Sequence, residues 1–125
     1  MTEIATKTSH KIYTIDNPKR IDISLHFTDD QFFELKKGYI PYQMEERWFI
    51  YFENDWLFFH RSWTGFGFYK AQILNEGDGY SIKEFWVERN PEKYLNENDK
   101  EDIDIISFVI ARFLLRVDVN QITHK

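Results

Sequence analysis

The stretch WFIYFENDWLFFHR, residues 48–61, decides the fold of this chain. Two runs of aromatic and aliphatic residues meet at Asn54-Asp55, and both of these residues tolerate the positive φ angles of a two-residue hairpin turn. With that turn, Trp48 and Phe59 fall on the same face of the paired strands, because side chains alternate between faces along a strand. The stretch therefore predicts an antiparallel hairpin with one apolar face toward a core.

The two faces of the predicted hairpin differ in character. One is mostly apolar and is expected to enter the core; it carries Trp48, Ile50, Phe52, Leu57, Phe59 and Trp63, joined by Glu46 and Arg61 near the open end. The other is mixed, with Arg47, Phe49, Tyr51, Glu53, Trp56, Phe58, His60 and Ser62. A register shift of one residue would change which residues face each other across the strands.

The sequence before the hairpin predicts another strand and a short helix. Residues 21–27 alternate between apolar and polar side chains, which is typical of a half-buried strand. Thr28 and Gln31 have the spacing of a capping box, and Gly38 supplies a left-handed stop. We therefore expect a helix of about ten residues between Thr28 and Gly38.

The sequence after the hairpin predicts two more strands, residues 66–74 and 80–88, separated by a loop rich in Gly, Asn and Asp. A pairing of these strands that places Lys70 opposite Glu84 brings opposite charges together across the sheet. The same register places Tyr69 opposite Phe85 and Leu74 opposite Tyr80.

Residues 99–117 predict a longer, C-terminal helix. Ile103, Ile106 and Ile110 recur at spacings of three and four, so one face of this helix is apolar and needs a partner. The aromatic sheet is the largest apolar surface available. We predict an α+β fold: a twisted antiparallel sheet of four to six strands, with a short N-terminal helix and a long C-terminal helix packed on one face.

Length, composition and charge indicate a globular protein and exclude several other classes. At 125 residues, 42% of them hydrophobic and 18% aromatic, the chain is expected to form one globular domain, 1–125, with flexible tails at 1–9 and 118–125. The net charge of −5 repels phosphate backbones, so nucleic acid is a poor partner. The sequence contains no cysteine, which excludes disulfides. It also shows no signal-peptide pattern and no membrane-spanning run, so we expect a cytoplasmic protein.

Polar residues near the open end of the hairpin form the candidate ligand site. An imidazole beside a guanidinium can bind a small anion, or the imidazole can act as a general base. The structural alternative is an exposed amphipathic face on which Arg47 pairs with a nearby carboxylate. The candidate ligand-binding residues are Glu45, Arg47, Tyr51, His60, Arg61 and Ser62.

Arg61 has a second interpretation, because it projects to the aromatic face. There it could stack on Trp48 or Trp63 as a cation–π contact, reach Glu46 diagonally, or point into a ligand cavity. The four histidines lack metal-ligand spacing, and no serine sits in a nucleophile-elbow pattern. We therefore predict no catalytic residue, no metal and no cofactor.

The run from Met44 to Gly65 resembles a stretch in small uncharacterised bacterial proteins. The residues that carry the resemblance are Glu45, Arg47, Trp48, His60, Arg61, Ser62, Trp63, Thr64 and Gly65. The resemblance implies a bacterial origin and a recurring small domain. It implies no activity.

Three functions follow as hypotheses. The first is a non-enzymatic binding or interaction module with a regulatory or immunity-like role, whose protein partner or second copy meets Trp56 and Phe58, since aromatic residues are enriched at interfaces. The alternative is a small-ligand-binding or enzymatic domain with an anion site around Arg47, His60 and Arg61. Nucleic-acid binding by aromatic stacking is a third hypothesis, which the negative charge disfavours.

Overall fold

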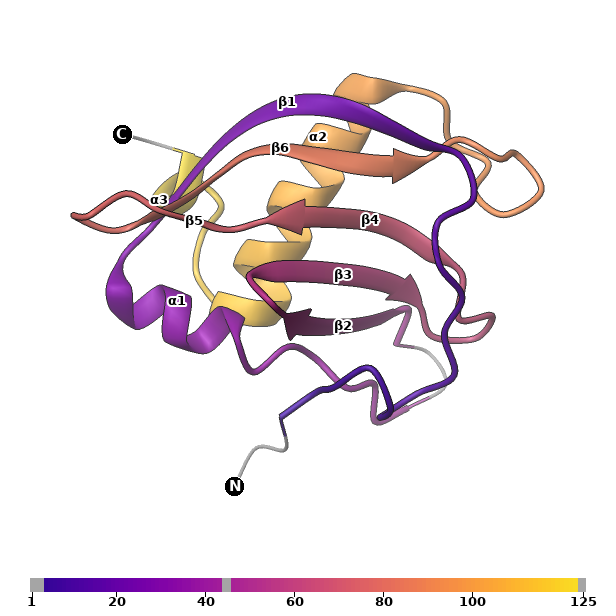
Figure 1. The fold of residues 1–125 in the computed structure, drawn as a ribbon, viewed down its shortest axis with the longest axis horizontal. Helices are drawn as coiled ribbons and strands as arrows, with labels where there is room; N and C mark the ends of the chain where they lie inside the picture. Colours follow the sequence, from indigo (N-terminus) through magenta and orange to yellow (C-terminus); the bar gives the residue numbers. More distant parts are fainter. Residues whose placement is uncertain (1–3, 44–45, 124–125) are drawn as a thin grey trace.

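The computed structural model describes residues 4–43 and 46–123 of the chain. Six antiparallel strands form one sheet in this part of the chain, in the order β1-β6-β4-β3-β2 with β5 beside β6 (Figure 1). The strands are β1 (Pro18–Phe27), β2 (Trp48–Glu53), β3 (Trp56–Arg61), β4 (Gly67–Gln72), β5 (Leu74–Asn75) and β6 (Tyr80–Glu88). The helices are α1 (Asp29–Leu35), α2 (Asp99–Val109), the π-helix η1 (Ile110–Leu115) and α3 (Asn120–Thr123). The predicted α+β class and the antiparallel sheet are confirmed.

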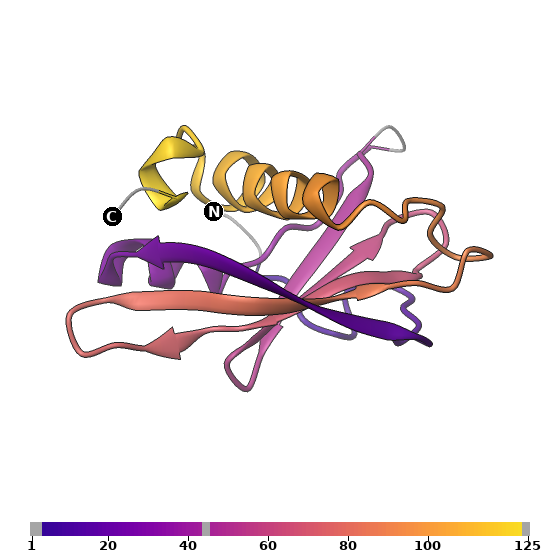
Figure 2. The ribbon, with the colours of Figure 1, turned by 90° about the horizontal axis from the view of Figure 1, so that it is seen from above.

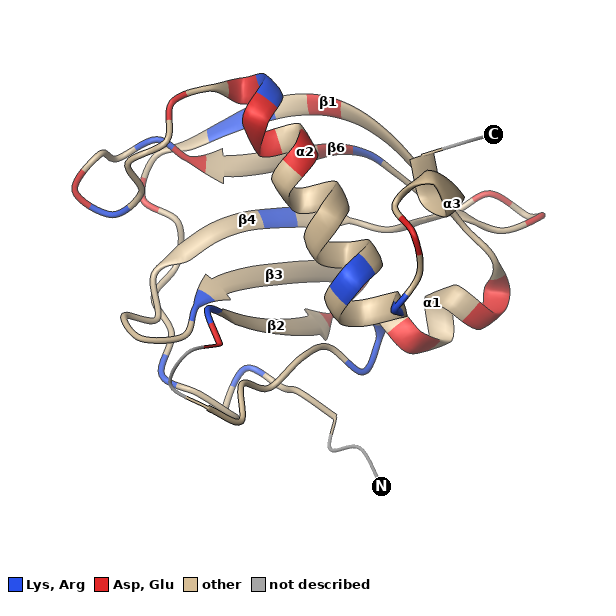
Figure 3. Cartoon of the chain, turned by 180° about the vertical axis from the view of Figure 1, so that it is seen from behind, with Lys and Arg blue, Asp and Glu red and all other residues tan. Residues whose placement is uncertain are grey.

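The helices and the sheet form two layers. Figure 2 shows α2 and α3 on the same side of the strongly twisted sheet, and Figure 3 shows α2 lying obliquely across the strands. Ile106 and Ile110 are fully buried and belong to the same core as Phe59 and Phe85 of the sheet. Burial of such side chains contributes roughly 1.5–3 kcal/mol each, so this layer contact is a main source of stability.

The hairpin at residues 48–61 has the predicted turn and register. Asn54 and Asp55 adopt φ angles of 52° and 70°, and Ile50 pairs with Phe59. Trp48 and Phe59 both enter the core, with ring centroids 6.5 Å apart.

The cap of helix α1 is also as predicted. The Thr28 hydroxyl accepts from the backbone N–H of Gln31 at 3.1 Å, and the Gln31 side chain accepts from the backbone N–H of Thr28 at 2.9 Å. Gly38 has φ of 66°, and a Cβ placed there would lie 2.3 Å from the carbonyl oxygen of Ile50. Only glycine therefore fits this close approach of the loop to β2.

The predicted pairing of residues 66–74 with 80–88 is wrong in register. Lys70 lies opposite Trp86 and Tyr69 opposite Val87, while Leu74 pairs with Ser81. The ladder is interrupted at Ile73, whose backbone N–H instead donates to the carbonyl of Asp55 at 2.7 Å. This break divides the expected strand into β4 and β5.

The C-terminal helix also departs from the expected α-helix over 99–117. From Ile110 onward it is a π-helix, and it ends where Arg116 adopts a left-handed φ of 59°. The backbone N–H of Val117 then donates to the carbonyl of Ala111 at 2.9 Å.

The segments expected to be tails contribute buried residues in the structure. Ala5 is 1% exposed, and its N–H donates to the carbonyl of Lys37 at 2.8 Å. Ile122 of α3 is fully buried against the core. None of the helices within 4–43 and 46–123 has the length and apolar character that crossing a membrane requires.

Candidate functional site

His60 lies on the hairpin face that carries Phe49 and Tyr51. Residues of the N-terminal segment, 4–17, pack against this face, among them Ala5 and His10. It is 4% exposed, its ring stacks on Tyr51 with centroids 5.7 Å apart, and Nδ1 lies 3.0 Å from the carbonyl oxygen of Gly65. Because a carbonyl can only accept, Nδ1 carries the proton and Nε2 holds a lone pair. No described residue donates to Nε2. His60 therefore has the geometry of a packing residue, closed off from any ligand.

The buried surroundings of His60 favour the neutral form of its imidazole. Burial lowers the pKa of His60, the hydrogen bond to Gly65 opposes this shift, and the charge of nearby His10 adds to it. His10 itself packs on Phe49 with ring centroids 5.2 Å apart.

On the same side of the molecule, the hydroxyl and the carbonyl of Ser62 are both already hydrogen-bonded. Its hydroxyl donates to the carbonyl of Glu46 at 2.6 Å, and its carbonyl accepts from His10 Nε2 at 2.6 Å. His60, Tyr51 and Ser62 thus share one packed face. Glu45 lies outside the described residues.

Arg47 and Arg61 are brought together elsewhere. They line a cleft of about 500 Å³ with Thr64, Phe66, Phe68 and the loop 91–96, which we call the arginine cleft. The Arg61 guanidinium lies 5.2 Å from the ring centroid of Trp63, so it makes one of the cation–π contacts expected for it. Within the described part of the chain, neither arginine forms an ion pair with a carboxylate.

Aromatic rings and the 91–96 loop form the rest of the arginine cleft. Tyr94 packs against Phe68 with centroids 4.4 Å apart. Lys93 lies over the ring of Phe66 and forms an ion pair with Asp16 at 2.9 Å. Glu92 is the carboxylate of this lining and is exposed. The cleft is therefore lined by two arginines together with the rings of Phe66, Phe68 and Tyr94.

A buried polar network fixes the loop behind the cleft. Asp102 is fully buried and accepts from the hydroxyls of Tyr69 and Tyr94 at 2.7 and 2.5 Å. It also accepts from Arg89 at 2.6 Å and from the Asn96 amide at 2.9 Å. One carboxylate on α2 thus joins β4, the residue that follows β6 (Arg89) and the 91–96 loop.

The phenols in this network stay protonated. Burial, together with the hydrogen bonds to Asp102, raises the pKa of Tyr94 to about 12 and also raises the pKa of Tyr69. Their hydroxyls lie 2.6 Å apart, and their two protons cannot serve all three contacts at once. Either both hydroxyls donate to Asp102, or one donates to Asp102 and the other donates to its neighbouring hydroxyl. Tyr94 is therefore held rigidly in the wall of the cleft.

Arg89 and Glu88 complete the anchoring of the loop. Arg89 also pairs with Asp99 at 2.6 Å, and the charges of both aspartates raise its pKa against the effect of burial. Glu88 is fully buried and accepts backbone N–H groups of Asp16, Asn17 and Asn90 at 2.7 to 3.0 Å.

The sequence held one signal for this network. Asp102 precedes Ile106 by four residues and so lies on the same face of α2. A carboxylate on the buried face of a helix requires donors, although the sequence alone does not say which residues supply them.

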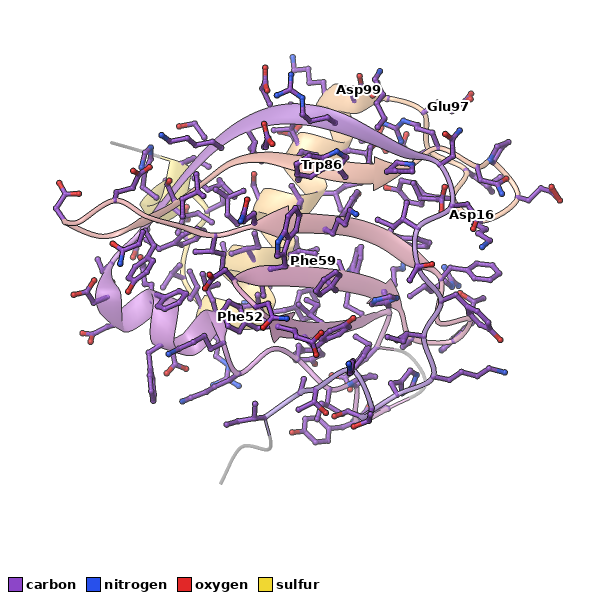
Figure 4. The ribbon with its side chains drawn as sticks, viewed as in Figure 1. Asp16, Phe52, Phe59, Trp86, Glu97 and Asp99 are labelled. Carbon is purple, nitrogen blue, oxygen red and sulfur yellow. The ribbon has the colours of Figure 1, made fainter. Side chains whose placement is uncertain are left out.

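The candidate interface residues lie on the side of the sheet away from α2. Trp56 packs on Trp86 with centroids 5.4 Å apart, and Lys70 lies 5.7 Å from the Trp56 ring. Figure 4 shows Trp86 on the face toward the viewer, with α2 behind the sheet. Phe58 stacks on Tyr51 at 4.8 Å. Both Trp56 and Phe58 are half-buried.

No cluster of three or more His, Asp or Glu residues suited to a metal ion occurs in 4–43 and 46–123. Comparisons with protein-family models, with curated proteins and with solved structures found no match to this chain. The arginine cleft is therefore the feature of this chain from which a function can be inferred.

Proposed function

We propose that this domain binds a small anionic ligand in the arginine cleft. The observation that carries the proposal is the pair Arg47 and Arg61, which line one cleft and lack a described carboxylate partner. A guanidinium offers a planar fork of N–H donors that matches the two oxygens of a carboxylate or phosphate. The ligand would supply the negative charge that the described residues do not place beside these arginines.

The surroundings of the two arginines support this proposal. Phe66, Phe68 and Tyr94 supply apolar surface, which weakens competition from water and strengthens a charge-assisted hydrogen bond. The network around Asp102 holds Tyr94 in place before a ligand arrives, so little conformational freedom is lost on binding.

Calorimetric titration with phenyl phosphate tests the proposal, because this probe combines an anion with an aromatic ring. We expect saturable binding by the full chain. R47A and R61A should each weaken it roughly ten- to a hundredfold, since one hydrogen bond to a charged group is worth about 1.5–3 kcal/mol. R61K should restore only part of the affinity, because a lysine ammonium lacks the fork.

The matched control is R112A, which removes an exposed arginine from η1 outside the arginine cleft. We expect this variant to bind phenyl phosphate like the unaltered chain. Equal losses in R47A, R61A and R112A, or no binding at all, would overturn the proposal.

A second candidate function is self-association through the sheet face that carries Trp56 and Trp86. No described helix lies on this face, and its tryptophan pair offers apolar area to a partner (Figure 4). Its charges are of both signs: Arg20 pairs with Glu84 at 2.8 Å, and Lys70 lies nearby opposite Trp86. A mixed-charge patch can be complementary to a second copy of itself across a two-fold axis.

Sedimentation equilibrium of the full chain tests this second candidate. We expect a dimer that W56S converts to a monomer, because the substitution removes apolar area from the centre of the contact. W63S changes an exposed tryptophan elsewhere and should leave the dimer intact. A monomeric unaltered chain at high concentration would reject the candidate.

A further inference from the structure

Arg47 also lines a second hollow. It has a volume of about 570 Å³ and runs between the start of β2 and helix α2. We call it the helix groove; its apolar lining comes from Trp48, Ile105, Phe108, Val109 and Phe113. Phe108 is 54% exposed, so the groove presents aromatic surface to solvent.

The dimensions of the helix groove suit an elongated group. Its helical lining extends from Glu101 to Phe113, which corresponds to roughly 18 Å at the rise of an α-helix. The π-turns of η1 set the position of Phe113, whose ring packs edge-on against Tyr39 with centroids 5.2 Å apart. Phe113 is therefore held at one end of the helical lining by an aromatic neighbour.

Arg47 belongs to the lining of both hollows. A ligand whose charged group contacts Arg47 and Arg61 can therefore continue past Arg47 into the helix groove. We infer that the ligand is an anionic amphiphile, with its headgroup at the two arginines and an aliphatic chain along α2. This inference rests on the proposed function, because it assigns a second part of the ligand to a neighbouring surface.

The charges around the helix groove favour this orientation. Glu101 and Asp104 line its α2 side and are exposed. Glu46 lines it as well, and its carboxylate accepts from the Tyr39 hydroxyl and from the backbone N–H of Gln43 at 2.9 Å. Three carboxylates repel a negative headgroup, so an anionic amphiphile would place its headgroup at the arginines and its uncharged chain in the groove.

Calorimetric titration of the full chain with decanoate and acetate tests the inference. Both probes carry the same headgroup, and decanoate adds an aliphatic chain. Each buried methylene improves affinity by roughly fourfold, so decanoate should bind at least tenfold more tightly than acetate even if only part of the chain is buried. Decylammonium, with the same chain and the opposite charge, should bind more weakly than decanoate.

The groove is tested by F108S, with F33S as the matched control. Phe108 and Phe33 are similarly exposed, at 54% and 59%, but Phe33 lies on α1 outside the groove. We expect F108S to abolish most of the advantage of decanoate over acetate and to leave phenyl phosphate binding unchanged. F33S should change neither. Both variants alter exposed side chains, so the fold should tolerate them.

The outcomes separate the two proposals. Binding of phenyl phosphate without a gain for decanoate overturns the amphiphile and keeps the anion site. Equal binding of decanoate and decylammonium overturns the assigned orientation of the ligand. Equal behaviour of F108S and F33S overturns the helix groove as the site of the aliphatic chain. Loss of all anion binding, or insensitivity to R47A and R61A, overturns the proposed function itself.

Discussion

Replacement of Asp102 by alanine is expected to lower the free energy of unfolding by about 3–5 kcal/mol, the range for removal of one partner of a buried ion pair. The carboxylate is fully buried and accepts from Tyr69, Tyr94, Arg89 and Asn96. Without it, the two phenols and the Asn96 amide lose this acceptor, while the Arg89 guanidinium keeps the half-exposed Asp99 and the carbonyl of Asn96. Each unsatisfied buried donor adds a desolvation cost.

Urea denaturation followed by circular dichroism measures this effect. D104A is the matched control, because Asp104 lies on the same helix and is exposed. That variant should change the free energy of unfolding by less than about 0.5 kcal/mol. D102N should fall between the two, since its amide oxygen still accepts one hydroxyl. A D102A variant as stable as D104A would show that the network contributes no stability.

Local signals made the hairpin and helix α1 predictable. Asn54 and Asp55 determine the turn, and the turn determines the pairing of β2 with β3. Thr28, Gln31 and Gly38 determine the ends of α1 within a window of eleven residues. In these elements each residue acts on neighbours close in sequence, so pattern and structure agree.

The pairing of β4 with β6 was not predictable in the same way. The interruption at Ile73 depends on a backbone hydrogen bond to Asp55, a residue of a different turn. Cross-strand charge pairing favoured Lys70 opposite Glu84, but Glu84 pairs with Arg20 of β1, which is far away in sequence. A pairwise preference of up to about 1 kcal/mol cannot set a register against such constraints.

For the candidate site, strand alternation predicts the direction of side chains inside the strands but not beyond their ends. Strand alternation places His60 reliably on the face with Phe49, because both lie inside the β2–β3 ladder. Arg47 and Ser62 lie one residue outside that ladder, where alternation no longer fixes direction. Arg47 therefore lines the arginine cleft beside Arg61, and the imidazole that was expected near it is covered by the N-terminal segment.

Acid is expected to destabilise the fold through His60. Burial lowers the pKa of His60 below its ordinary value of 6.5, so below about pH 6.5 the unfolded chain binds a proton that the folded chain resists. The contribution of His60 to the free energy of unfolding should therefore be fully present above pH 6.5. It should fall continuously as the pH drops toward the pKa of His60 in the folded chain. The pKa values of Asp16, Glu46 and Asp99 are also lowered. Their protonation changes stability only below the ordinary carboxyl pKa of about 4, outside the pH window of His60.

Urea denaturation at pH 7.5, 6.0 and 5.0 measures the slope of unfolding free energy with pH. H60N should flatten this slope, because asparagine does not titrate and its amide nitrogen can replace Nδ1 as donor to Gly65. It should cost stability at pH 7.5, where it leaves a cavity between Tyr51 and Phe49. H26N alters a more exposed histidine and should keep the slope of the unaltered chain. A slope unchanged by H60N would mean that groups other than this buried imidazole control the acid response, since protonation of His60 would then carry no folding penalty.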